Sequence, residues 1–390
     1  MDKKILFLYS RDVEINDSGA SKTMILLIQY LSRNGYECHC LFKIKNDSNY
    51  NIFYHEKGGN EKDSIRKVVI ENDIHIVLAP EARLYASILS TSLKGLNCKI
   101  ITALHSKPGY DRLRLHILLC ESLKYNQKIL GKIRAFFLLL IYPIFYIIYI
   151  LRDYIVFRNA YKKSDYLILL SESYINEFSS IYHVSKDKLR AIGNPVSFNI
   201  YADDRIIDNK EKKVLIVARF EERSKRILVA LKAWKLVQDR FPDWTFEIVG
   251  FGRSLPLYQE FIQKNRLTRV FFKGRQVPLI YYKSASLFLM TSAYEGWPMT
   301  LVESMQMGCV PVVMDSYSAL HSIIEDRING YIVTDGDIEA FANIMADLMT
   351  NELKCKTMAK QAVIKSHTWE PDKICSRYKD LLDSIIELYV

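Results

Sequence analysis

The stretch LFLMTSAYEGWPMTLVESMQMGCVPVVM, residues 287–314, carries the pattern that decides the fold class. Its two ends are short apolar runs typical of buried strands. Between them, the residues from Thr300 to Met307 have helical composition and stop at Gly308, and Pro298 suits the first helical position. A strand, a helix and a second strand in this order predict one unit of a parallel sheet that is covered by helices.

The same alternation extends along almost the whole chain. In the first half the expected strands are KILFLYS, ECHCLF, IHIVLA, KIITAL and DYLILLS. After Asn194-Pro195 and the polar stretch ADDRIIDNKEKK, they are VLIVAR, FEIVG, VFFKG, LFLMTS, VPVVM and YIV. The break predicts two facing Rossmann-like α/β domains, residues 1–195 and 196–367, with a cleft at the carboxyl ends of both sets of strands. Residues 368–390 read as one more helix.

Composition excludes several classes of protein. The chain has 390 residues, 49% of them apolar, which is enough for the cores of two or three domains. Charged residues make up 25%, and no low-complexity tract is present, so fibrous and disordered classes are excluded. Seven cysteines without a C-x-x-C pair argue against a disulfide framework and a zinc ribbon, and favour a reducing compartment. The uncharged run before Arg11 is too short for a signal peptide, so we expect no export.

The positive charge is concentrated in one segment. The net charge is +10, and residues 106–163 hold eleven Lys and Arg against three acidic residues. The same segment includes 17 uncharged residues, 135–151, interrupted by Pro143. They would span about 25 Å, short of the roughly 30 Å of a bilayer core. Basic flanks around an apolar helix favour a peripheral position on an anionic membrane surface. The alternative is a helix buried under a domain interface.

Two carboxylates flank the start of the helix in the opening stretch. Glu295 lies in the loop before this helix, and Glu303 lies in its second turn. Free amides at a helix N-terminus bind phosphate, and nearby carboxylates accept hydrogen bonds from sugar hydroxyls. The pattern therefore suits a ligand that contains both phosphate and polyol. Taken alone, such a pair is more often one acid at a helix start and one on a solvated face.

Cations and glycines follow other strands of the chain. In VLIVARFEERSKR, Arg219 comes just after a strand and Lys225 at the expected start of a helix, so both could converge on one pyrophosphate; the alternative is ordinary surface charge. Gly250 and Gly252 follow FEIVG and allow a close backbone approach, or form a simple tight turn. His105 follows KIITAL at the carboxyl end of a strand, where a satisfied loop histidine is the alternative.

The order strand, E-G-W-P-M, helix, V-E-S-M, G-C-V-P-V-V resembles the retaining glycosyltransferases of family 4, the group 1 transferases of GT-B fold. The resemblance covers nearly the whole chain. It implies that Glu295 contacts the donor sugar, that Glu303 contacts the ribose of the nucleotide, and that Arg219 and Lys225 neutralise the leaving diphosphate. The chain departs from the usual pattern at Trp297, where a small residue is more common, and in the six-residue spacing from Arg219 to Lys225, which is more usually five.

Further positions match by the same resemblance. The segment Ser18–Ser21, with one glycine where the family often has two, corresponds to the loop that borders donor phosphate and acceptor. His105 lies against the donor sugar, Arg275 near the base, and Ile192–Val196 form the interdomain hinge. The last helix, opened by Thr368-Trp369-Glu370, returns to the N-terminal domain. The implied catalytic residues are Arg219, Lys225, Glu295 and His105, and the implied donor-binding residues are Gly19, Gly250, Gly252, Arg275, Gly296, Met299, Thr300, Leu301 and Glu303.

The expected function is transfer of a sugar, with retention of configuration and by front-face attack, from a nucleoside-diphosphate sugar to a lipid-linked or polysaccharide acceptor. None of the motifs described above presents an Asp-x-Asp or a His/carboxylate cluster with metal-ligand spacing, so we expect no metal and no other cofactor. The expected location is cytoplasmic, at the inner face of the membrane. Alternatives are a nucleotide-sugar epimerase of the same fold, a glycosidase, which leaves Arg219 and Lys225 unexplained, and a non-catalytic basic membrane adaptor. Nucleic acid is not an expected partner, because aliphatic runs interrupt the basic segment.

Overall fold

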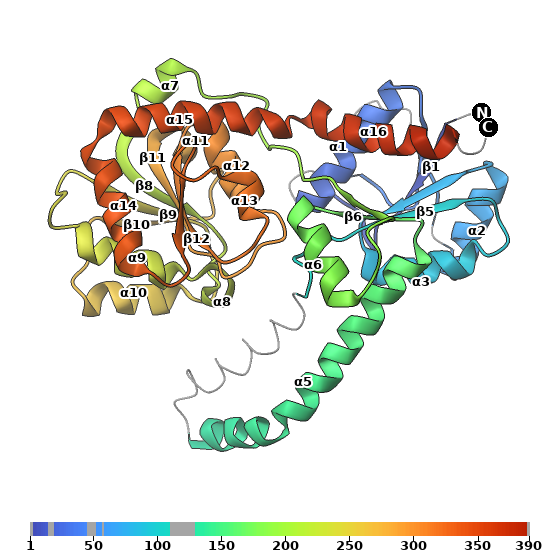
Figure 1. Cartoon of the computed structure of the whole chain (residues 1–390), viewed down its shortest axis with the longest axis horizontal. Coiled ribbons are helices and arrows are strands. Elements are labelled where there is room, and N and C mark those ends of the chain that lie inside the picture. The colour runs from blue at the N-terminus through green and yellow to red at the C-terminus, as the bar shows by residue number, and fades with distance from the viewer. Residues whose placement is uncertain (1–2, 15–18, 45–51, 57, 110–128, 388–390) are drawn as a thin grey trace. The chain divides into compact units, whose positions relative to one another are not determined.

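The computed structural model describes residues 3–14, 19–44, 52–56, 58–109 and 129–387 (Figure 1). The chain divides into two compact units, each built around its own parallel sheet. The N-terminal unit consists of Met1–Asn194 together with Pro371–Val390, and the C-terminal unit consists of Pro195–Glu370. The predicted fold class of two Rossmann-like α/β domains is confirmed.

The N-terminal unit has a seven-stranded sheet in the order β3-β2-β1-β4-β5-β6-β7. The face that carries Leu6 and Val77 packs against α2 and α3 in one buried cluster. All four residues of β4 are buried, as expected for a parallel strand with both faces covered. In chain order the elements are β1 (Lys4–Phe7), α1 (Gly19–Arg33), β2 (Glu37–Cys40), β3 (Ile52–Tyr54), α2 (Glu61–Glu71), β4 (Ile76–Ala79), α3 (Ala82–Ser92), β5 (Lys99–Ala103), α5 (Ile129–Lys163), β6 (Tyr166–Leu169), α6 (Glu172–Tyr182), β7 (Leu189–Ala191) and α16 (Pro371–Glu387).

The C-terminal unit has a six-stranded parallel sheet in the order β10-β9-β8-β11-β12-β13. The strand order reverses between β8 and β11, which is where doubly wound sheets bind their ligands. The elements are α7 (Asp204–Asp208), β8 (Glu211–Val217), α8 (Glu222–Lys225), α9 (Ile227–Val237), β9 (Thr245–Val249), α10 (Leu255–Lys264), β10 (Val270–Gly274), α11 (Leu279–Ser284), β11 (Ala285–Met290), α12 (Met299–Gln306), β12 (Val310–Asp315), α13 (Leu320–Ile323), β13 (Tyr331–Thr334), α14 (Ile338–Thr350), α15 (Glu352–Ser366) and the 3-10 turn η1 (His367–Trp369).

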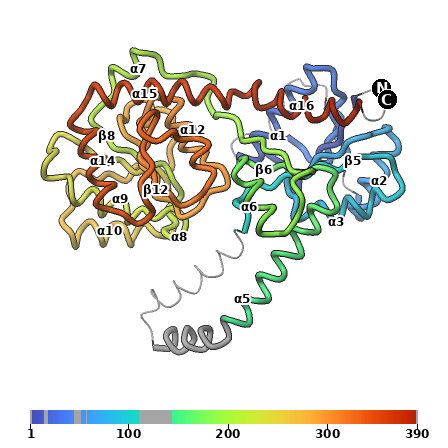
Figure 2. Tube along the Cα trace, viewed as in Figure 1, coloured from blue at the N-terminus to red at the C-terminus, as the bar shows by residue number. Residues whose placement is uncertain are grey.

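The C-terminal helix α16 belongs to the N-terminal unit, as predicted (Figure 2). It packs on α1, and Asp383 accepts hydrogen bonds from the Lys3 ammonium and the Tyr36 hydroxyl, both at 2.7 Å. Burial, with the neighbouring carboxylate of Asp383, raises the pKa of Tyr36. Contacts with lysines and Tyr36 hold the pKa of Asp383 at about 2, although burial acts in the opposite direction. Helix α16 is thus held both by packing on α1 and by the hydrogen bonds of Asp383.

The structure corrects several local predictions. Every predicted strand is present, but β3 and β7 were not predicted, because runs of three residues carry no clear period. The stretch predicted as a polar linker contains α7, whose first turn is capped by Asp203 through the amide of Ile206, and the start of β8. Pro298 lies one residue before α12 rather than inside it.

Two predicted segment starts also differ. Gly19 opens the first turn of α1 instead of lying in a loop before it, and Ser18 lies outside the described residues. Thr368 and Trp369 belong to η1, so the last helix begins at Pro371, a residue that suits a first helical position.

The basic and apolar segment predicted over residues 106–163 is described only in part, since residues 110–128 lie outside the described residues. Helix α5 contains Pro143, and its side chains are described from there onward. The helix is held to α6 by Arg158, which donates to the carbonyl oxygens of Tyr182 and His183 at 3.1 and 3.2 Å. Within the described residues, no helix combines the length and hydropathy that crossing a membrane requires.

Candidate functional site

A small hollow lies between the carboxyl ends of β8 and β11 in the C-terminal unit, where the strand order reverses. Its volume is about 240 Å³, including space open to solvent. We call it the switch-point hollow. Three residues predicted from the sequence reach it from three different segments: Lys225 from α8, Glu295 from the loop after β11, and Thr300 from α12. The other lining residues are Ile216, Val217, Ala218, Phe288, Leu289, Met290, Thr291 and Ser292.

Lys225 and Glu295 form an ion pair in this hollow. The Lys225 Nζ lies 2.6 Å from the Glu295 Oε1, and the two side chains are only 18% and 13% exposed. A pair this well shielded from solvent is screened less than a surface pair. The predicted diphosphate-binding cation and the predicted sugar-binding acid are therefore already in contact, 70 positions apart in sequence.

Arg219 follows β8 at the same edge of the sheet and is exposed. Its neighbour Ala218 lines the switch-point hollow, but Arg219 does not. Its guanidinium has no ion-pair or hydrogen-bond partner among the residues that the structure describes. Arg219 is thus a cation beside the hollow with all of its donors available.

The amides at the start of α12 are not equivalent. The Met299 amide donates to the Trp297 carbonyl at 2.9 Å, and the Leu301 amide donates to the Pro298 carbonyl at 3.0 Å. Thr300 lines the switch-point hollow, and within the described residues its amide makes no hydrogen bond. Met299, Thr300 and Leu301 were predicted to bind the donor, and of their three amides the Thr300 amide is the one left for a ligand. Gly296 lies in the loop between Glu295 and this helix.

Glu303 has a partner that sequence reasoning missed. The Tyr282 hydroxyl, from α11, donates to the Glu303 Oε2 at 3.1 Å. Tyr282 is fully buried, and burial raises its pKa well above 10, so the hydroxyl keeps its proton and acts as a donor. Its carbonyl oxygen also accepts from Lys210 and Cys309. Tyr282 therefore fixes the orientation of a carboxylate that the sequence predicts to hold ribose.

Gly250 and Gly252 have positive φ angles of 141° and 154°. A Cβ at Gly250 would lie 1.8 Å from the Ala218 carbonyl oxygen, and one at Gly252 would lie 2.4 Å from the Phe220 carbonyl oxygen. The close approach that the sequence predicts is therefore made to the segment that carries Arg219. Between them, Phe251 is 52% exposed, and the Arg275 guanidinium lies 5.3 Å from its ring centre. An exposed ring and guanidinium could stack a nucleobase.

Trp297, the departure from the family pattern, is buried. It makes an edge-to-face contact with Trp369 at 5.8 Å and does not line the switch-point hollow. Its Nε1 has no hydrogen-bond partner within the described part of the chain. The indole thus fills the core beside η1 and leaves the hollow free.

His105 and Gly19 lie in the N-terminal unit. His105 follows β5, and its Nδ1 is buried with no hydrogen-bond partner among the described residues. Burial lowers the pKa of His105 to about 4, so the imidazole is neutral near pH 7. It can exchange hydrogen bonds with a hydroxyl but supplies no positive charge. The Gly19 carbonyl accepts from Thr23, which also bonds Asn194 of the predicted hinge at 3.0 Å.

A larger hollow, of about 730 Å³, lies elsewhere in the C-terminal unit. It is bordered by Lys212, Ser286 and Gly308, which stand at or before the amino ends of β8, β11 and β12. The larger hollow therefore lies at the amino ends of the strands, whereas Glu295 lies at their carboxyl ends. No predicted site residue lines it.

Comparisons with known proteins show similarity to glycosyltransferases. Residues 198–364 match the sequence model of the family described as glycosyl transferases group 1. The chain is 23% identical over 239 residues to poly(glycerol-phosphate) alpha-glucosyltransferase of Bacillus subtilis, covering 60% of this chain and 35% of the relative. It is 26% identical over 231 residues to the amylovoran biosynthesis glycosyltransferase AmsD of Erwinia amylovora, covering 57% and 64%. The alignments thus span between about one third and two thirds of these relatives.

Solved structures share the fold. A structure of HepE from Anabaena in complex with UDP superposes with a TM-score of 0.69 at 16% identity, covering 98% of this chain and all of the other. At this identity the likeness establishes the GT-B fold alone. Among known proteins, then, the chain is similar to glycosyltransferases in fold and, over residues 198–364, in sequence.

Proposed function

We propose that this chain is a retaining glycosyltransferase of family 4 that takes a hexose from a nucleoside-diphosphate sugar. The observation that carries the proposal is the Lys225–Glu295 pair in the switch-point hollow, beside the unbonded Thr300 amide. A cation and an amide suit the diphosphate, and a carboxylate next to them suits the sugar attached to it. A phosphate ligand and a polyol ligand are thereby held at adjoining positions.

In the proposed reaction the bond between the anomeric carbon and the diphosphate oxygen breaks. Lys225, Arg219 and the Thr300 amide stabilise the negative charge that develops on the leaving diphosphate. The acceptor hydroxyl attacks from the same face, forms the new glycosidic bond, and gives its proton to the departing phosphate oxygen. Glu303, oriented by Tyr282, accepts hydrogen bonds from ribose. We propose that these groups replace a metal ion.

The names of similar proteins support a choice of substrates. Relatives include an alpha-glucosyltransferase acting on poly(glycerol-phosphate) and a glycosyltransferase of amylovoran biosynthesis. A protein of similar fold has been solved with UDP. We therefore propose a UDP-sugar as donor and a polysaccharide or lipid-linked glycan as acceptor.

The test uses the full chain with UDP-glucose, UDP-N-acetylglucosamine, UDP-galactose and GDP-mannose in EDTA. We expect one donor to raise the melting temperature and to release its nucleoside diphosphate slowly by hydrolysis. Proton NMR spectra recorded before the released sugar mutarotates should show that it has the same anomeric configuration as the donor sugar. Inverted sugar would contradict retention, and dependence on added metal would contradict metal independence. A changed sugar still attached to its nucleotide would identify an epimerase, and no binding at all would favour the adaptor.

We further propose that the protein lies peripherally on the inner face of the membrane, through α5. Supporting this, six apolar side chains between residues 144 and 155 are more than half exposed. A helix buried under an interface would show the opposite. Arg152, Lys162 and Lys163 on the same helix are exposed as well, and their charge suits anionic lipid. The exposed apolar residues are Ile144, Phe145, Ile147, Ile148, Leu151 and Ile155.

A further inference from the structure

Arg226 has a strained backbone directly after Lys225. It joins α8 to α9 in the left-handed conformation, with φ 46° and ψ 44°. This conformation is unfavourable for a residue with a Cβ, and it persists only where the surroundings hold it. Such strain next to a site residue calls for a compensating set of contacts.

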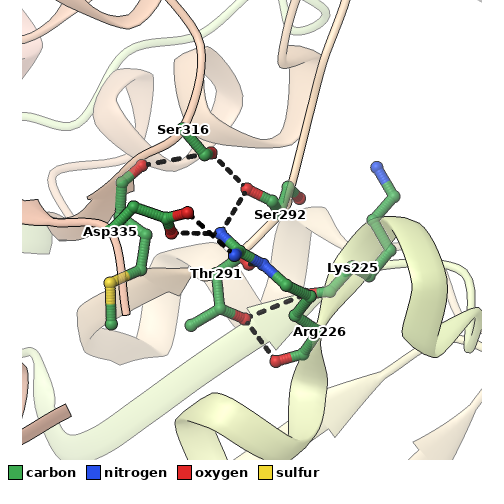
Figure 3. Close-up of polar contacts among 7 residues, drawn as sticks. Lys225, Arg226, Thr291, Ser292, Ser316 and Asp335 are labelled. Carbon is green, nitrogen blue, oxygen red and sulfur yellow. Dashed lines mark hydrogen bonds and ion pairs between the residues drawn. The ribbon is translucent and has the colours of Figure 1, made fainter. Parts of the chain in front are cut away.

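The Arg226 side chain supplies those contacts (Figure 3). Its Nε donates to the Thr291 carbonyl at 2.7 Å, and its Nη2 donates to the Ser292 carbonyl at 3.2 Å. Its Nη2 and Nη1 also form a two-pronged ion pair with Asp335, at 2.6 and 3.1 Å. Asp335 directly follows β13. One guanidinium thus ties together the ends of β11 and β13.

Further contacts run from the residues that follow β11 back to the end of α8. The Thr291 hydroxyl bonds the carbonyl oxygens of Lys225 and Arg226 at 2.9 and 3.0 Å. The Ala293 amide donates to the Ser224 carbonyl at 2.8 Å. The segment that carries Lys225 and the segment that leads to Glu295 are therefore locked to each other.

We propose that Arg226 is a positioning residue that holds the Lys225 ammonium against Glu295, a role that rests on the proposed function. The Arg226 guanidinium and the Lys225 side chain extend in different directions (Figure 3). The Arg226 guanidinium donates to Asp335 and to two carbonyl oxygens, so we infer that Arg226 acts through the backbone and not as a ligand of phosphate. Asp335 orients the guanidinium by bonding two of its nitrogen atoms. We call Arg226 and Asp335 together the clamp.

The first test does not depend on catalysis. Acetylation of lysines, followed by mass spectrometry, compares the wild type with Arg226→Gly, a variant that relieves the strain but deletes the clamp. We expect acetylation of Lys225 to become about fivefold faster, with exposed Lys232 unchanged, because local opening frees the ammonium. Arg327→Gly is the matched control, since Arg327 also has a positive φ of 66° but its side chain is 80% exposed and pairs only with Asp326 in the described structure. Unchanged labelling of Lys225 in Arg226→Gly would overturn the proposal.

The second test asks whether Arg226 acts through Lys225. In Arg226→Gly and Asp335→Asn we expect donor turnover to fall about tenfold while the donor KM changes little. Adding Arg226→Gly to Lys225→Ala should cost no further turnover, whereas a general loss of stability would reduce it again. If the wild type releases no nucleoside diphosphate from any sugar donor, the proposed function fails, while the acetylation result still decides the clamp.

Discussion

At the scale of single residues, the switch-point hollow contains a salt bridge where a donor diphosphate is proposed to bind. Lys225 must share its charge between Glu295 and an incoming phosphate. Arg219 has no such competitor among the described residues and is exposed. Arg219 therefore has donors free to bind the charge that develops on the proposed leaving group.

This difference leads to a prediction for Arg219→Ala. We expect turnover of the donor to fall by about 100-fold, the scale for removing one donor from a developing anion, while nucleotide affinity changes less than about threefold. Steady-state kinetics and isothermal titration check the two quantities separately. Arg205→Ala, at an exposed site whose side chain is 92% accessible, is the control. Equal losses in affinity and turnover would show that Arg219 binds ground state and transition state alike.

Substitutions of Glu303 and Tyr282 should weaken nucleotide binding to different extents. Glu303→Ala should weaken UDP binding by about 1.5 to 3 kcal/mol, and Tyr282→Phe by about 0.5 to 1.5 kcal/mol, since only the orienting hydrogen bond is lost. Tyr281→Phe, the adjacent residue on α11, is the matched control. Isothermal titration with UDP measures all three. An unchanged affinity in Glu303→Ala would remove ribose as its ligand.

His105 gives a pH dependence with a defined sign. Its pKa is about 4 in the folded protein and about 6.5 when unfolded, so the unfolded state binds more protons between these values. Stability should therefore fall as the pH drops below about 6.5, and this contribution amounts to about 1 to 2 kcal/mol at pH 5. Burial also lowers the pKa of His39 and His55, which act in the same direction.

The measurement is urea unfolding at pH 7.5 and pH 5. We expect His105→Gln to lose less stability between the two values than the wild type does. His321→Gln, at a histidine that is 56% exposed, should behave like the wild type. If His105→Gln and the wild type respond alike, the histidine is not shielded as described.

At the scale of elements, the exposed part of α5 is the surface proposed to meet lipid. Replacing Ile144, Ile148 and Leu151 with serine should reduce flotation on vesicles containing phosphatidylglycerol at least tenfold, because each loses about 1 kcal/mol or more of apolar burial. A matched control replaces Leu353 and Ile364, exposed residues of α15. Flotation of the α5 variant at the wild-type level would contradict the assignment.

Charge on the same helix is tested separately. Neutralising Arg152, Lys162 and Lys163 should weaken binding to anionic vesicles by about 1 kcal/mol for each charge and leave neutral vesicles unaffected. Arg158 is unsuitable for this test, because its guanidinium holds the C-terminus of α6.

Sequence patterns predicted the strands, which repeat along the chain, and missed the side-chain contacts, which depend on packing. The apolar runs of β8 and β11 place Lys225 and the loop of Glu295 at one edge because parallel strands share their polarity. No such rule marks Tyr282, whose hydroxyl reaches Glu303 only because the fold brings these two residues of α11 and α12 together. Arg226 was missed for another reason: its neighbours give no sign of a positive φ in a residue other than glycine or asparagine. The roles of the predicted site residues stay predictions.

At the scale of the whole molecule, α16 stabilises a unit from which it is distant in sequence. Leu382 of this helix is fully buried, and Leu382→Ala should lower the stability of the N-terminal unit by about 2 to 5 kcal/mol. Hydrogen exchange resolved by segment should show faster exchange in β1 and α1, with β8 and β11 unchanged. Met345→Ala, in the core of the C-terminal unit, should give the reverse pattern. Equal acceleration in both units would mean that they unfold as one.

The position of α16 also bears on biosynthesis. Residues 195–370 leave the ribosome before residues 371–387 do, so the C-terminal unit has all of its strands while α1 still lacks its covering helix. The nascent N-terminal unit therefore keeps an uncovered apolar helix face until residues 371–387 have been translated. Chaperone capture is expected to concentrate on the N-terminal unit, and a ribosome stalled before residue 371 would hold one finished unit and one incomplete one.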